Sequence, residues 1–354
     1  MDSVTQAALG AAIGGVVLGR RLGRKAVLIG AVLGTLPDLD VVLDYGDAVA
    51  NYTEHRGFSH SLFVLAGLAT ALAILTALFA PTRDIRFRHW WAFFGLCLLT
   101  HPLLDALTTY GTQLWWPLVV RPSARPLIFI IDPLYSLPLL VGIIIALVTG
   151  NGRKGPAWGV TLSSAYLVFA LGAKVLVEHR LEPVLAERGL VDAPRLVQPT
   201  PFNTLLWRIT VVDGADHYEG IAGILDGQAP IELERFRRGT QWEAAALASH
   251  NGQRLDWFAG PFLRYDVSLI DDTPTLTATD LRLGLPGFHP FTFTLLAGDL
   301  EASLWQPLSS EELDPPEGDN GQALVQLARR AIDPGESLCL GDYVQQVWHA
   351  EVSC

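Results

Sequence analysis

Long apolar segments alternate with short polar connections along the first half of the chain. A helix needs roughly 20 apolar residues to cross a bilayer, so this pattern predicts six membrane helices. We expect them near residues 4–19, 26–43, 61–80, 90–108, 127–149 and 157–177. The first is short and rich in glycine and alanine, so it could be tilted, packed inside the bundle or only partly inserted.

The pattern changes after residue 177. Short alternating segments separated by turn dipeptides, typical of β-strands, follow a helix and a proline-rich stretch. We expect strands at 205–212, 263–267, 275–283 and 291–296. The predicted fold is an α-helical polytopic membrane domain (1–177), a helix and linker (178–200) and a small β-rich α+β soluble domain (201–354).

Composition supports this division. Half of the 354 residues are hydrophobic, only 17% are charged and the mean hydropathy is +0.31, which together is too apolar for an ordinary soluble protein. The net charge of -11 comes mostly from the second part and argues against a nucleic-acid partner. The segment Met1–Gln6 has no basic residues, so we do not expect a cleaved signal peptide.

Basic residues indicate the orientation. They cluster in alternate connections, at 20–25, 83–88 and 153–154, which should therefore be cytoplasmic. The protein is then expected in the bacterial inner membrane as a multi-pass protein whose C-terminal domain is extracytoplasmic, or periplasmic. Arg121 and Arg125, in an outward connection, depart from this rule.

Seven ionisable residues interrupt or border the apolar segments, all toward the outward face. They are Asp38, Asp40, His55, His60, His101, Asp105 and Asp132. His101 and Asp105 are four apart and so share a helix face. A carboxylate or imidazole at membrane depth is costly without a partner, so the set predicts a bound cation.

A mixture of histidine and aspartate suits zinc first, with manganese or iron as alternatives, better than magnesium or calcium. The predicted ligands are Asp38, Asp40, His55, His60, His101 and Asp105. These exceed the first shell of one ion, so either two ions are bound or some residues orient the ligands or act as a base. We expect the base to be Asp105 or Asp132.

Several of these residues have simpler alternatives. Asp132 could cap the helix that begins at Pro133, and Ser59 is better placed as a helix cap than as a nucleophile. Arg121 and Arg125 could anchor lipid headgroups or bind a phosphate or carboxylate of the substrate.

The cysteines carry little information about function. Cys97 lies in an apolar segment and should be inert. Cys339 and Cys354 could form a disulfide in an oxidising compartment.

Three motifs, in order, resemble those of the YdjM/YbcI-type family of bacterial inner-membrane proteins. They are Gly-Thr-Leu-Pro-Asp-Leu-Asp at 34–40, His-Arg-Gly-Phe-Ser-His-Ser at 55–61 and Thr-His-Pro-Leu-Leu-Asp at 100–105. Members are described as metal-dependent hydrolases, and the resemblance implies that activity and a metal site on the motif residues. Many members have a histidine where this chain has Gln6.

The resulting hypothesis is a membrane-embedded hydrolase that uses metal-activated water. Its position at headgroup depth favours an ester, phosphoester or amide in a lipid-like or amphiphilic substrate. The alternatives are a metal-binding membrane sensor or scaffold, and an ion transporter, neither with hydrolytic activity.

Overall fold

The structure is a computed structural model that describes residues 1–79, 85–299, 304–315, 320–344 and 348–351. The chain forms two compact units. Unit 1 contains residues 1–43, 55–172 and 201–203, and unit 2 contains residues 44–54, 173–200 and 204–354. Unit 2 is thus assembled from separate segments of the chain, a discontinuity that the predicted domain boundaries do not contain.

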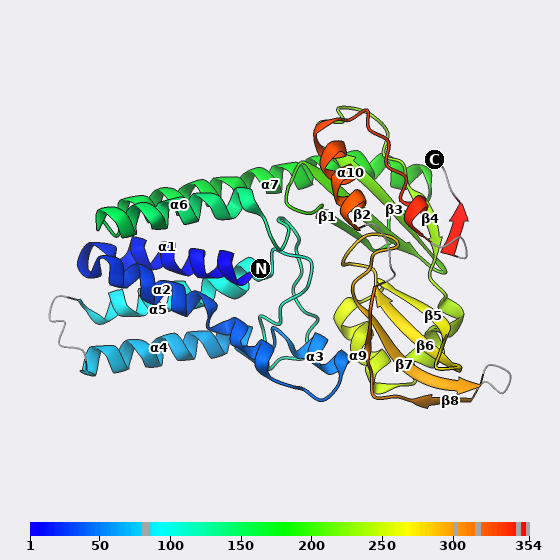
Figure 1. The fold of residues 1–354 in the computed structure, drawn as a ribbon, viewed down its shortest axis with the longest axis horizontal. Helices are drawn as coiled ribbons and strands as arrows, with labels where there is room; N and C mark the ends of the chain where they lie inside the picture. Colours follow the sequence, from blue (N-terminus) through cyan, green and yellow to red (C-terminus); the bar gives the residue numbers. More distant parts are fainter. Residues whose placement is uncertain (80–84, 300–303, 316–319, 345–347, 352–354) are drawn as a thin grey trace. The chain divides into compact units, whose positions relative to one another are not determined.

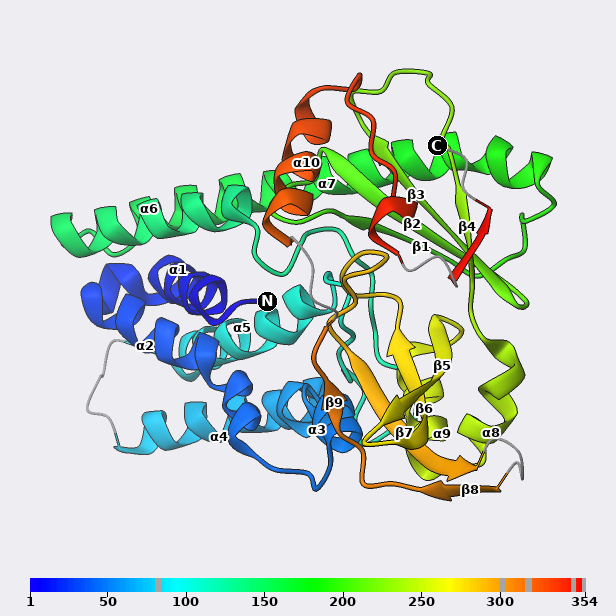
Figure 2. The ribbon, with the colours of Figure 1, turned by 45° about the vertical axis from the view of Figure 1, so that its right-hand side comes forward.

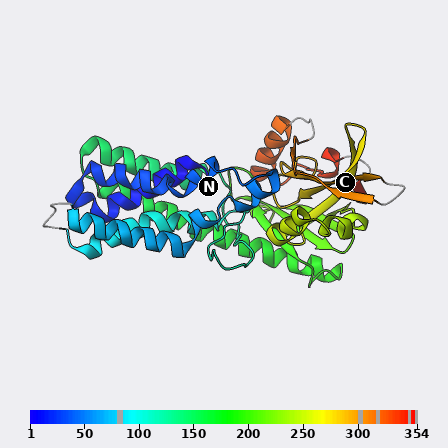
Figure 3. The same ribbon diagram turned by 90° about the horizontal axis from the view of Figure 1, so that it is seen from below.

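Unit 1 is a bundle of helices that lie side by side (Figures 1 and 3). Its helices are α1 (Ser3–Leu22), α2 (Arg24–Thr35), α4 (Leu62–Phe79), α5 (Phe87–Asp105), α6 (Pro133–Thr149) and the first part of α7 (Lys154–Glu187). Each predicted helix therefore has a counterpart, although residue 80, at the end of the third prediction, lies outside the described residues.

Within the described residues, two helices are long and apolar enough to cross a membrane by length and composition, namely α4 and α7. Helix α6 is apolar but has only 17 residues. The helical character of this half is confirmed, whereas crossing by all six helices stays a prediction.

Three predicted helices differ clearly from their counterparts. The sixth, predicted to end at 177, continues to Glu187 as α7 and includes the start of the predicted linker. The prediction of one helix over 26–43 is wrong, because α2 ends at Thr35 and a 3₁₀ helix, η1 (Pro37–Val42), follows. Pro37 has no N–H to continue the α-helical hydrogen bonds. Helix α6, predicted to begin at 127, begins at Pro133, and Asp132 is its N-cap.

Unit 2 contains two antiparallel sheets (Figure 2). The first has the order β1-β2-β3-β4-β10, with strands Arg195–Pro199, Leu206–Asp213, Asp216–Gly223, Glu234–Arg237 and His349–Glu351. The second has the order β5-β6-β7-β8, with strands Leu263–Ile270, Thr273–Asp280, Thr292–Asp299 and Leu304–Pro307, and β9 (Glu312–Leu313) pairs with β7. The expected strands are thus present, and β1 lies where the sequence predicted a linker.

Nearly every residue of β2 is buried. Because successive side chains of a strand point to opposite sides, both faces of the first sheet are buried at this strand. Trp207 and Ile209 pack in one cluster with Leu181 and Leu185 of α7. Leu206, on the other face, packs with Leu327 of α10 (Asn320–Ile332). The sheet is therefore covered by a helix on each side (Figure 2).

A short helix from the membrane half of the sequence belongs to unit 2. Helix α3 (Ala48–Glu54) packs beside α9 (His250–Ala259). The hydroxyl of Tyr52 donates a 3.0 Å hydrogen bond to Asp280, and Arg254 forms an ion pair with Glu54. The sequence predicted only a polar connection here.

Candidate metal centre

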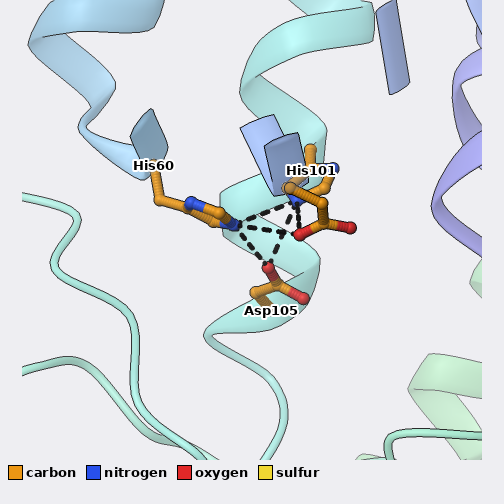
Figure 4. A group of neighbouring side chains, drawn as sticks. His60, His101 and Asp105 are labelled. Carbon is orange, nitrogen blue, oxygen red and sulfur yellow. Dashed lines mark hydrogen bonds and ion pairs between the residues drawn. The ribbon is translucent and has the colours of Figure 1, made fainter. Parts of the chain in front are cut away.

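Four side chains from three segments point toward one another in unit 1. His101 and Asp105 lie one turn apart on α5, His60 ends the short 3₁₀ helix η2 (Phe58–His60), and Asp38 lies in η1. Figure 4 shows the two imidazoles and the Asp105 carboxylate converging on one point. One ligand atom from each of the four residues lies within 4.8 Å of all the others.

The spacing of these atoms fits a single metal ion. The Nε2 atoms of His60 and His101 are 3.1 Å apart, and Oδ2 of Asp105 lies 3.1 Å from the first and 3.3 Å from the second. Oδ1 of Asp38 lies 3.5 Å from Nε2 of His60 and 3.1 Å from Nε2 of His101. Ligands of a tetrahedral zinc ion, with bonds of about 2.0–2.2 Å, lie about 3.3–3.6 Å apart.

Hydrogen bonds behind the two histidines fix their tautomers. His101 Nδ1–H donates to the carbonyl oxygen of Gly34 (2.6 Å). His60 Nδ1–H donates to Ser59 Oγ (2.8 Å), whose hydroxyl donates to Oδ2 of Asp40 (2.7 Å). Since each Nδ1 carries the proton, each neutral imidazole presents the lone pair of Nε2 to the cluster, as metal-ligating histidines do.

The donor set is suited to a cation. Two imidazole lone pairs and two carboxylate oxygens face one another, and Oδ2 of Asp105 and Oδ2 of Asp38 are buried without hydrogen-bond partners among the described residues. Lone pairs crowded in this way repel one another unless a positive charge lies between them. The residues present fit a divalent ion.

Two of the six predicted ligands lie behind this cluster instead of in it. The carboxylate of Asp40 accepts hydrogen bonds from Nδ1 of His55 (3.1 Å), the backbone N–H of Arg56 (2.9 Å) and Ser59. In this position Asp40 orients His60 through Ser59, and His55 in turn holds Asp40. The sequence could not show which of the two histidines is a ligand and which an outer partner, because the turn between them decides which imidazole points toward the cluster.

The other predicted site residues lie apart from the cluster. Asp132 is the N-cap of α6, where its carboxylate accepts from the N–H groups of Leu134 and Tyr135 and from the hydroxyl of Tyr166 (2.9 Å). This agrees with the simpler alternative, a helix cap. Arg121 and Arg125 are exposed, and the described contacts join neither guanidinium to the four ligands.

Three further groups surround Asp105 and were not assigned to the site from the sequence. The side-chain N–H of Gln6 donates to Oδ1 of Asp105 (3.0 Å), the amino group of Met1 forms an ion pair with it, and the Arg56 guanidinium lies 3.6 Å away. The position of Arg56 inside the His-Arg-Gly motif was the one available indication of its role.

Comparison with known proteins agrees with these motifs. A model of the YdjM inner membrane protein family matches residues 1–177. YfhP of Bacillus subtilis (strain 168), described as uncharacterised, is 26% identical over 305 residues, which cover 82% of this chain and 89% of YfhP. The inner membrane protein YbcI of Escherichia coli (strain K12) is 32% identical over 122 residues, or 32% of this chain and 64% of YbcI.

No solved structure matches the chain significantly. The family match covers half of the chain and includes all four residues of the cluster. On this basis the chain belongs to the YdjM inner membrane protein family.

Proposed function

We propose that this membrane protein is a metal-dependent hydrolase that binds one divalent ion through Asp38, His60, His101 and Asp105. The observation that carries the proposal is the convergence of two Nε2 atoms and two carboxylate oxygens at 3.1–3.5 Å. Nitrogen and oxygen donors in this number favour zinc, with manganese and iron as alternatives.

A divalent ion at this position supplies a Lewis acid that can activate water at neutral pH. The side chain of Asp38 is 15% exposed, whereas those of the other three residues are at most 1% exposed. Substrate therefore approaches past Asp38. Its Oδ2 atom has no hydrogen-bond partner among the described residues, so it is the atom we assign to accept a proton.

This assignment revises the roles expected from the sequence. Both oxygens of Asp132 are used, Oδ1 as the cap of α6 and Oδ2 as the acceptor of the Tyr166 hydroxyl, so it is not our candidate for the base. Asp105 is surrounded by Gln6, Arg56 and the imidazoles, which suits a ligand that is held rigidly.

The location of the site favours an amphiphilic substrate at the outer face of the membrane. Gln6, at the start of α1, contacts Asp105, and Gly19, near the end of α1, packs against Gly152 in the α6–α7 turn. Gln6 and Gly19 lie near opposite ends of α1, which is about 30 Å long at 1.5 Å per residue. The metal cluster and the α6–α7 turn are therefore at opposite ends of this helix. Basic residues gather at the second end, at 20–25 and 153–154, which by the positive-inside rule supports a cytoplasmic position for that end.

A second function is favoured by the closure of the cluster. Structural zinc sites have four protein ligands, whereas catalytic sites keep a position open. Four ligand atoms, three of them on almost fully buried side chains, would also suit a metal-binding sensor or scaffold. Such a protein would bind metal and lose stability without it, but would not hydrolyse esters.

Metal content tests the proposal. Protein purified in detergent would be examined by elemental mass spectrometry as wild type, His60→Ala and Asp105→Ala, with His179→Ala as the control because that histidine is exposed. We expect one equivalent of metal in the wild type and in His179→Ala, and none in the two cluster variants.

Hydrolysis assays on phosphoester and lipid substrates would then separate the two functions. Activity that is lost with the metal supports the hydrolase. A metal that raises the thermal midpoint without any hydrolysis supports the structural alternative. Well-folded wild-type protein that stays metal-free after reconstitution would overturn both.

A further inference from the structure

Arg56 is buried beside the metal cluster in an unusual backbone conformation. Its side chain is 4% exposed, and its φ angle of 62° lies in the left-handed region that side chains other than glycine rarely adopt. Two hydrogen bonds hold it there: its N–H donates to Asp40 (2.9 Å), and its carbonyl accepts from the N–H of Gln113 (3.0 Å). Strained residues of this kind are concentrated at functional sites.

The guanidinium has unused hydrogen-bonding capacity. Its carbon lies 5.0 Å from the centre of the Tyr110 ring, which fixes its orientation, and Nη1 lies 3.6 Å from Oδ1 of Asp105. Nε and Nη1 are buried and have no hydrogen-bond partners among the described residues. Buried N–H groups of a permanently charged side chain are normally satisfied.

The position of these donors indicates what would satisfy them. They lie beside a carboxylate whose other oxygen faces the metal cluster, so they border the cluster on the Asp105 side. A guanidinium matches the oxygens of a phosphoryl group in charge and in geometry. A carboxylic ester or an amide is neutral and offers these donors no anionic oxygen.

We propose that Arg56 binds an anionic oxygen of a phosphoryl group, so that the substrate of this site is a phosphoester. The inference rests on the proposed metal-dependent hydrolase. It makes Arg56 the specificity-determining residue and replaces the substrate-binding role that the sequence suggested for Arg121 and Arg125.

Binding of inorganic phosphate to metal-loaded protein tests this role. Isothermal titration calorimetry would compare the wild type with Arg56→Gln and Arg56→Lys, and the control would be Arg121→Gln, an exposed arginine. Because charge-assisted hydrogen bonds are strong, we expect Arg56→Gln to weaken phosphate binding about ten- to a hundredfold. Arg56→Lys keeps the positive charge but lacks the paired N–H donors of a guanidinium, so its phosphate affinity should be intermediate. The phosphate affinity of Arg121→Gln should equal that of the wild type.

Metal content, measured on the same samples, separates the two proposals. Unchanged metal with weakened phosphate binding supports the role of Arg56. Equal phosphate binding in wild type and Arg56→Gln, or no phosphate binding by metal-loaded wild type, overturns that role and leaves the metal site intact. Loss of metal from both Arg56 variants would make Arg56 a structural partner of Asp105. A wild type that binds no metal overturns the proposed function itself.

Competition then identifies the source of the phosphoryl group. Phosphatidic acid in mixed micelles and soluble glycerol phosphate would each be titrated against bound phosphate. Displacement by the first alone assigns a lipid headgroup, and displacement by the second alone assigns a soluble phosphoester. Failure of both to displace phosphate would contradict the phosphoester assignment.

Discussion

The orientation of His60 depends on a relay of two hydrogen bonds. Nδ1 of His60 donates to Ser59, and Ser59 donates to the buried carboxylate of Asp40. The relay keeps the proton on Nδ1 and makes Nε2 a better donor to a cation. The adjacent Ser61 has a different partner, because its hydroxyl donates to the carbonyl oxygen of Trp116.

This difference between neighbouring serines provides a matched test. Ser59→Ala should weaken metal binding about 10- to 100-fold, the usual effect of losing an outer partner of a ligating histidine. Ser61→Ala should leave the affinity unchanged, since it does not touch either imidazole nitrogen. Metal affinity would be measured by competition with a chelator. Equal affinities in the two variants would mean that the relay does not orient His60.

At this scale, the sequence identified which residue types would meet but not how each would be used. His101 and Asp105 could be predicted together because helical spacing places them on one face. His55 and Asp40 could not be separated from the ligands, since Asp40 lies in the 3₁₀ helix η1 and His55 in the turn after α3, where sequence spacing does not fix the side-chain direction. Arg56 was missed because nothing in the sequence indicates a left-handed backbone at an arginine.

At the scale of elements, glycine allows α1 and α2 to pack backbone against backbone. A Cβ atom on Gly30 would lie 2.3 Å from the carbonyl oxygen of Gly10, and one on Gly34 would lie 2.4 Å from that of Gln6. Small residues four apart permit such close approach of membrane helices. The contact matters for the site, because Gly34 accepts the hydrogen bond of His101 and Gln6 donates to Asp105.

Gly30→Ala should therefore destabilise unit 1 by about 1–3 kcal/mol or more, the cost of overpacking a tight contact. Gly67→Ala is the control, since a Cβ atom on Gly67 has nothing within 4 Å. Thermal unfolding in detergent would compare the two variants with the wild type. Equal thermal midpoints for both variants would show that the close contact of α1 with α2 is not required.

Hydrophobic periodicity was sufficient for the helices and for several strands, because both are local patterns. It could not predict that α2 would stop at Thr35 or that β1 would occupy the expected linker. Strand β1 exists because β2 offers it a partner, from Arg195↔Val211 to Pro199↔Trp207. Pairing between distant segments leaves little trace in the sequence of either one.

At the scale of the whole molecule, α3 constrains how the chain passes through the membrane. Residues 44–54 and residues beyond 204 form one folded unit, so both must lie on the same side. The chain between them must then cross the membrane an even number of times. The four helices α4, α5, α6 and α7 satisfy this condition if each of them crosses.

Cysteine labelling tests this arrangement. In a chain whose own cysteines are replaced by serine, Asp44→Cys and Glu232→Cys should react equally with a membrane-impermeant maleimide in intact cells. Asn151→Cys, in the α6–α7 turn, should react only after lysis, since three crossings separate it from α3. All three positions are exposed. Labelling of positions 44 and 232 from opposite sides would contradict unit 2 as a single folded body.

The insertion of α3 also sets an order of events during synthesis. Tyr52 and its partner Asp280 are 228 residues apart, so at usual translation rates they are made roughly 10–45 s apart. In that interval α3 lacks its contacts with α9 and Asp280, while the helices α4 to α7 are being made. Unit 2 can therefore close only after the ribosome has passed residue 280, and a chain released at residue 172 would keep the four metal-binding residues but leave α3 without the surface that buries Tyr52.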